Sequence, residues 1–148
     1  MILVSACLIG MMCRYDGLAK ADEKVIQYIR DKWWIPVCPE QMGGLATPRE
    51  QAEIVGNRIL SLGGKDVTEA FEKGARETLK LVKMARVTKA VLKARSPSCG
   101  CGMIYDGTFS GILRPGSGKT AQILMENGIR VISEEMIEKD DFSFPHTL

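Results

Sequence analysis

Apolar residues recur along the chain with two different periods, which predict an alternation of short strands and helices. Residues 2–6 form a nearly continuous apolar run, typical of a strand buried on both faces of a parallel sheet. Within 22–32, Val25, Ile26 and Ile29 recur at helical spacing, and Trp33 continues the series. The chain therefore begins with a strand, a loop and a helix.

The next part of the chain predicts a second strand and a hairpin. Residues 35–38 form another short apolar run, whose proline favours a strand start or an edge position. Residues 53–60 contain two apolar runs on either side of a Gly-Asn pair, which is typical of a small β-hairpin. We expect this hairpin to lie beside the main sheet.

A long helix is predicted from a capping box of Asp66 and Glu69 to about residue 85. In the rest of the chain, Gly128 is a signal for the end of a helix, and Ser117 and Ser133 are signals for the start of one. The elements expected there are a strand at 89–93, a helix capped by Ser117, a strand at 129–132 and a short helix capped by Ser133.

Strands that alternate with helices imply right-handed crossovers and a mostly parallel sheet of about four strands. The predicted fold class is α/β: three α/β/α layers around a Rossmann-like sheet, with a small β-hairpin insertion. A chain of 148 residues with 45% hydrophobic and 26% charged side chains is typical of one domain, here 1–148.

The charge and hydropathy of the chain limit which partners, such as nucleic acid or a membrane, the protein is expected to bind. The 20 basic and 18 acidic residues are scattered without long runs of one sign, so nucleic acid is expected only through a local site. No apolar run approaches the roughly 20 residues that cross a bilayer. The first residues lack the basic segment of a signal peptide, and we expect a cytoplasmic protein.

Three of the five cysteines follow predicted strands. Cys7 follows the first strand, Cys38 ends the second, and Cys99 lies in the loop after 89–93. Since ligands collect at the carboxyl ends of parallel strands, these thiols are predicted to converge at one edge of the sheet. The alternative is that each is a small buried hydrophobe.

The spacing of these cysteines also bears on the metal. No Cys-x-x-Cys pair is present, which disfavours a structural zinc site. An iron–sulfur cluster held by three thiolates leaves one iron open as a Lewis acid. Two rivals stay open: a non-catalytic module in which the three cysteines hold zinc or a cluster, and a thiol redox protein using Cys99 and Cys101.

Several short motifs, distributed over nearly the whole chain, are highly specific in combination. They are SACLIG at 5–10, RYDG at 14–17, CPE at 38–40 with GGL at 43–45, TPR at 47–49, DVT at 66–68, SPSCG at 96–100 and IYDGTFSG at 104–111. In these motifs the chain resembles the formerly uncharacterised family of short domains that contains thiouracil desulfidase.

The resemblance implies a 4Fe–4S cluster that removes sulfur from a thiolated pyrimidine base or nucleoside without net redox change. Cys7, Cys38 and Cys99 fall on the family's cysteine motifs and are the expected ligands. Three further residues fall in its polar motifs and are candidates for substrate binding or proton transfer: Asp16, Glu40 and Ser98. Some members of the family have no assigned substrate.

The expected reaction adds water to the carbon that carries sulfur, and a carboxylate must take the proton. Glu40 is two residues after a predicted ligand, and Asp16 is the alternative. Ser96 or Ser98 is expected to donate a hydrogen bond to the substrate. Structural roles compete with these: Glu40 can cap a helix or turn, and Asp-Gly, as at Asp16, is a turn signal.

Other features are expected to lie outside the chemistry. The segment 115–120, PGSGKT, resembles a phosphate-binding loop but has leucine at 113 where the pattern needs glycine, so a helix start is favoured. The SPSCG motif at 96–100 does not require a cysteine at position 101, so Cys101 is not expected to be a ligand. Cys13 lies in a loop that can reach the site. His146 is the single histidine, which excludes a histidine-based triad. Trp33 and Trp34 are expected to pack beneath the sheet.

Overall fold

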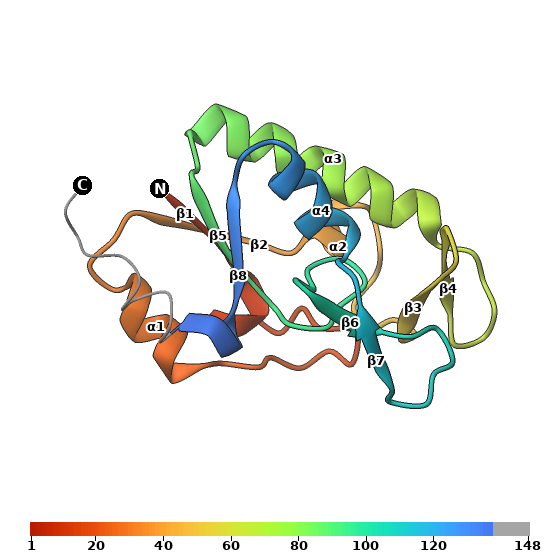
Figure 1. The fold of residues 1–148 in the computed structure, drawn as a ribbon. Helices are drawn as coiled ribbons and strands as arrows, with labels where there is room; N and C mark the ends of the chain where they lie inside the picture. The colour runs from red at the N-terminus through yellow and green to blue at the C-terminus, as the bar shows by residue number, and fades with distance from the viewer. Residues whose placement is uncertain (138–148) are drawn as a thin grey trace.

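The central sheet has four parallel strands in a computed structural model that describes residues 1–137 (Figure 1). The strands are β1 (Ile2–Ser5), β2 (Trp34–Val37), β5 (Lys89–Leu92) and β8 (Arg130–Ser133). They lie in the order β2-β1-β5-β8, and each neighbouring pair is parallel. The predicted α/β class with a parallel, Rossmann-like sheet is confirmed.

Helices cover both faces of this sheet (Figure 1). They are α1 (Glu23–Ile29) on one face, and α3 (Thr68–Ala85) and α4 (Lys119–Glu126) on the other. Alternate side chains of a strand point to opposite faces. Accordingly, Val4 packs in one core cluster with Val25 of α1, whereas Leu3 packs in the other with residues of α3 and α4. The sheet and the helices on its two faces therefore form three layers.

Two antiparallel hairpins lie outside the central sheet. The predicted one is present, formed by β3 (Ala52–Val55) and β4 (Arg58–Ser61). A second, formed by β6 (Met103–Tyr105) and β7 (Leu113–Pro115), was not predicted, because three-residue strands are too short to show an alternation. Three short helical turns complete the described elements: η1 (Ala6–Ile9), α2 (Pro39–Met42) and η2 (Glu134–Met136).

Two of the three predicted side-chain caps are wrong. Helix α3 begins at Thr68, and Asp66 instead accepts the Thr68 N–H at 2.9 Å within a turn. Helix α4 follows Gly118 without a side-chain cap, since its first amides bond to the backbone of a loop described below. The third cap is confirmed, because the Ser133 hydroxyl accepts the Glu135 N–H at 3.2 Å.

The tryptophans do not pack beneath the sheet. Trp33 is 82% exposed and Trp34 is 39% exposed, because they lie at the amino end of β2, which is an edge strand. In the described part of the chain, no helix is long and apolar enough to cross a membrane. His146 lies outside the described residues.

Candidate metal centre and active site

A cavity of about 300 Å³ lies at the carboxyl ends of β1, β2 and β5. Its walls include the residues that directly follow these strands, which are Ala6, Cys38 and Lys93. This is the edge at which open parallel sheets bind ligands, and at which the sequence predicts convergence of the cysteines.

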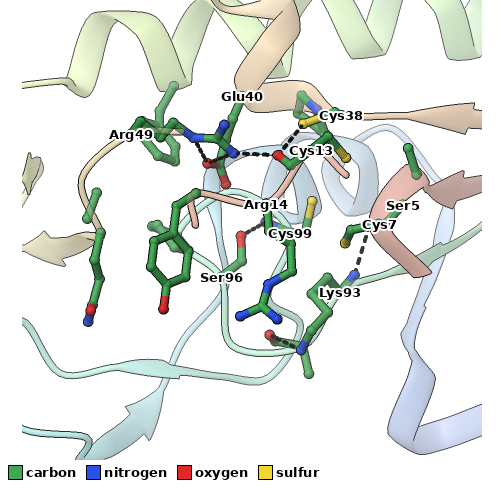
Figure 2. A pocket seen from close by; sticks show the side chains of 18 of the residues that line it. Ser5, Cys7, Cys13, Arg14, Cys38, Glu40, Arg49, Lys93, Ser96 and Cys99 are labelled. Carbon is green, nitrogen blue, oxygen red and sulfur yellow. Dashed lines mark hydrogen bonds and ion pairs between the residues drawn. The ribbon is translucent and has the colours of Figure 1, made fainter. Parts of the chain in front are cut away.

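Four thiols line this cavity: those of Cys7, Cys13, Cys38 and Cys99 (Figure 2). Cys7, Cys13 and Cys99 are buried, and Cys38 is half-buried. The three expected ligands are thus brought together from loops far apart in the sequence. Cys101 is held elsewhere, since its thiol donates to the Val131 carbonyl at 3.4 Å and packs in the core beside α3 and α4.

Cys38 is positioned by a very close contact between α2 and α3. Cys38 directly precedes α2, and its carbonyl accepts the Met42 N–H at 3.0 Å. Gly43 and Gly74 form the crossing of the two helices, where a Cβ on Gly74 would lie 2.0 Å from the Pro39 carbonyl oxygen. Backbone therefore packs on backbone here, and the long helix fixes the segment that carries Cys38.

Cys99 lies in a loop that folds around Ser96. The Ser96 hydroxyl oxygen accepts two backbone N–H groups, from Ser98 at 3.0 Å and Cys99 at 2.8 Å. The Gly100 N–H returns to the Ser96 carbonyl at 2.8 Å. These bonds hold the Cys99 thiol at the cavity.

The segment that resembles a phosphate-binding loop supports the Cys99 loop instead. The first amides of α4 donate to carbonyls of that loop, from Lys119 to Pro97 and from Thr120 to Ser98, both at 2.9 Å. A Cβ on Gly118 would lie 2.4 Å from the Ser98 carbonyl, so glycine is required by this close approach. These amides are already satisfied, as expected of a helix start that binds no phosphate.

Two of the expected ligands, Cys38 and Cys99, have raised pKa values and hold their protons tightly when no metal is bound. Burial raises the pKa of Cys99 from 9.0 to about 12. The pKa of Cys38 is also raised, mainly by its hydrogen bond with the Cys13 thiol and then by burial. Thiolates are the form that binds metal, so loading this site must release protons.

The donor set suits a cluster better than a single ion. Within residues 1–137, no three histidine, cysteine or acidic side chains come close enough together to hold one metal ion. Thiolates are the usual ligands of a 4Fe–4S cluster. The chemistry of the three cysteines that line the cavity therefore suits such a cluster.

Of the two carboxylates that line the cavity, Glu50 accepts the Gly63 N–H at 2.6 Å, and Glu40 directly follows the segment of Cys38 (Figure 2). Oε2 of Glu40 accepts from Nε of Arg49 at 2.8 Å and from Nη2 at 2.6 Å. Arg49 also donates to the Cys13 carbonyl at 3.0 Å, which ties Glu40 to the loop after β1. Among the described residues no hydrogen bond engages Oε1 of Glu40, which leaves this oxygen for a ligand.

The structure does not bring Asp16 to the cavity surface. Its Oδ1 accepts the Leu18 N–H at 3.0 Å, as in the Asp-Gly turn that the sequence suggests. Its Oδ2 lies 3.5 Å from Nη2 of Arg14, which does line the cavity.

Ser98 lies behind the cavity wall. It is 1% exposed, and its hydroxyl is 3.0 Å from the Thr120 hydroxyl and 3.8 Å from the Cys99 sulfur. Ser96, which the sequence offered as its alternative, lines the cavity.

Sequence reasoning did not single out the aromatic side chains of the cavity, which are Tyr15, Phe71 and Tyr105. The two tyrosines belong to the RYDG and IYDG motifs, so their motif positions carried the signal. Phe71 lies in the apolar stripe of α3 and cannot be distinguished there from a core residue.

Comparisons with known proteins agree with this geometry. A solved structure described as "[4Fe-4S]-dependent thiouracil desulfidase TudS" superposes with a TM-score of 0.89 at 40% identity, covering 96% of this chain and 95% of that one. The uncharacterized protein YbbK of Bacillus subtilis (strain 168) is 46% identical over 144 residues, which are 90% of this chain and 95% of YbbK. The 4Fe–4S cofactor that the resemblance implies is the one on which TudS depends.

The family prediction is confirmed as well. The sequence model of the family described as "2-thiouracil desulfurase" matches residues 2–136. This match covers every described strand and all the cysteines. The chain belongs to the 2-thiouracil desulfurase family.

Proposed function

We propose that this protein is a 4Fe–4S-dependent desulfidase that hydrolyses the thiocarbonyl of a thiolated uracil, with release of sulfide. One observation carries the proposal: three thiols from three loops at the sheet edge share a cavity with the Glu40 carboxylate, whose Oε1 is free to act. The family and the similarity to TudS support the substrate class. Five free thiols suit a reducing compartment such as the cytoplasm.

Cys7, Cys38 and Cys99 would hold the cluster. When bound, it supplies an iron without a protein ligand, which acts as a Lewis acid toward the sulfur of the substrate. The overall reaction converts a thiocarbonyl and water into a carbonyl and hydrogen sulfide, so no electrons are gained or lost.

Glu40 accepts the proton of the attacking water through Oε1. Arg49 holds the other carboxylate oxygen with two hydrogen bonds, which fixes the direction of Oε1. Asp16 contributes indirectly, because it pairs with Arg14 at the cavity wall.

Ser96 is the hydroxyl donor toward the substrate. Its oxygen already accepts two backbone N–H groups, so its own proton is left for a ligand in the cavity. Ser98 holds the loop through Thr120 and acts by positioning Cys99. The aromatic rings of Tyr15, Phe71 and Tyr105 supply apolar surface for a pyrimidine ring.

Anaerobic reconstitution with iron and sulfide tests the proposal. We expect broad visible absorption in the wild type and its loss in Cys7→Ser, Cys38→Ser and Cys99→Ser. Cys101→Ser is the matched control and should retain the absorption, because its thiol lies in the core. Unchanged spectra in all three ligand variants would reject the ligand assignment.

A sulfide-release assay against thiolated bases and nucleosides then separates an enzyme from a non-catalytic cluster module. The reconstituted wild type should release sulfide from thiouracil or a thiolated nucleoside. A stable cluster without sulfide release from any member of the panel would favour the non-catalytic module.

A further inference from the structure

Glu53 is a buried carboxylate that the chemistry above does not use. It lies in β3 and is 1% exposed. Three N–H groups satisfy it: Oε1 accepts the backbone N–H of Gly107 at 2.9 Å and of Phe109 at 3.1 Å, and Oε2 accepts the Gln51 side-chain amide at 3.2 Å. Burying a carboxylate costs free energy unless the group is fully hydrogen-bonded, so these three donors are needed to stabilise Glu53 in its buried position.

The backbone of the β6–β7 loop is shaped to meet this carboxylate. Gly107 and Phe109 both have positive φ, at 93° and 57°, which turns their N–H groups toward the same oxygen. Phe109 is a non-glycine residue in the left-handed region, which is sparsely populated without compensating contacts. A Cβ on Gly107 would lie 2.7 Å from the Ile54 carbonyl oxygen, so the loop sits directly on β3.

The same carboxylate contacts two walls of the cavity. On one side it binds Gln51, which lines the cavity together with Ala52. On the other side it binds the loop between Tyr105 and Gly111, and both of these residues line the cavity too. Glu53 is thus the point at which the hairpin β3–β4 and the loop after β6 are joined.

We infer that Glu53 is a positioning residue that holds the Tyr105–Gly111 wall in place for the substrate ring. It does not touch the reacting atoms, because its carboxylate is enclosed by the amides of the loop and of Gln51. Its removal leaves two half-buried backbone N–H groups without an acceptor and frees the loop from β3. Substrate binding should suffer more than the chemical step.

The test compares Glu53→Ala with Glu53→Gln, and uses Glu69→Ala on the exposed side of α3 as a control. Hydrogen exchange of residues 103–112 is the first readout, since it does not depend on catalysis. We expect faster exchange in Glu53→Ala and near-normal exchange in Glu53→Gln, whose carbonyl still accepts from Gly107 and Phe109. Unchanged exchange in Glu53→Ala would overturn the inference.

Steady-state kinetics with thiouracil on the reconstituted enzyme is the second readout, and this one rests on the proposed function. We expect the KM of Glu53→Ala to rise about tenfold, with kcat within about threefold of wild type and the cluster absorption retained. A lowered kcat at unchanged KM would also overturn the inference. If the wild type itself releases no sulfide, the proposed function fails, and the exchange result still decides the role of Glu53.

Gly107→Ala keeps the test decisive if Glu53→Ala does not fold. This variant disturbs the contact of the loop with β3 without removing the carboxylate. It should likewise accelerate exchange in 103–112 and raise KM. Wild-type values for both quantities would contradict the inference.

Discussion

At the scale of single residues, the proposed chemistry depends on how Arg49 holds Glu40. The planar guanidinium binds Oε2 through two nitrogens and also reaches the Cys13 carbonyl. A lysine ammonium at this position would keep the charge but lose the fork, and a point charge does not fix the direction of the carboxylate. The contact therefore matters for orientation as well as for charge.

We predict that Arg49→Lys lowers kcat about tenfold and that Glu40→Gln lowers it by about 10² or more, both with the cluster absorption retained. Amide replaces carboxylate in the second variant, so no group is left to accept the proton of water. Steady-state sulfide release measures both. Arg58→Lys is the control, because Arg58 pairs with Asp66 on the surface. Wild-type kcat in Glu40→Gln would remove it from catalysis.

At the scale of elements, the crossing of α2 and α3 determines where Cys38 and Glu40 lie. Alanine in place of Gly74 would gain about 1 kcal/mol of helix propensity. Its Cβ would lie 2.0 Å from the Pro39 carbonyl oxygen, and forced overpacking of this kind typically costs about 1–3 kcal/mol. The clash outweighs the propensity, since backbone is what must move.

Gly74→Ala is therefore expected to lower the melting temperature of the protein and to reduce the iron bound per chain after reconstitution. Calorimetry and iron analysis measure the two effects. Lys73→Ala, at the neighbouring exposed position of α3, is the matched control and should change neither. Full iron loading in Gly74→Ala would show that Cys38 does not depend on this crossing.

The same scale shows what a sequence can and cannot predict. The parallel strands and long helices were predictable, because burial gives them regular apolar periods. The β6–β7 hairpin was missed, since its strands have three residues each. Two caps were wrong: Asp66 accepts the Thr68 N–H within a local turn, and the Thr120 N–H donates to the Ser98 carbonyl of a loop distant in sequence. The second partner is tertiary and leaves no local pattern.

At the scale of the whole molecule, the sheet edge explains why part of the site was predictable. Strand ends converge by topology, so the meeting of Cys7, Cys38 and Cys99 in one cavity could be expected before any coordinates. The direction in which a side chain points within a loop could not be expected from the sequence. Ser98 is nearer to Cys99 in the sequence than Ser96 is, and Asp16 lies in the RYDG motif, yet their side chains turn toward Thr120 and Leu18.

The buried thiols also couple the stability of the cluster-free protein to pH. Burial raises the pKa of Cys99 from 9.0 to about 12, so the folded state binds this proton more tightly than the unfolded state. The resulting stabilisation is complete below about pH 9 and is lost as the pH rises toward 12.

We expect Cys99→Ala to lose this part of the pH dependence. The difference in free energy of unfolding between the two proteins should shrink by up to about 1.4 kcal/mol per pH unit above pH 9, as measured by denaturant titration. Lysines and tyrosines titrate alike in both proteins, so they cancel in this difference. A constant difference from pH 8 to 11 would show that the Cys99 proton is held no more tightly in the fold than in the unfolded chain.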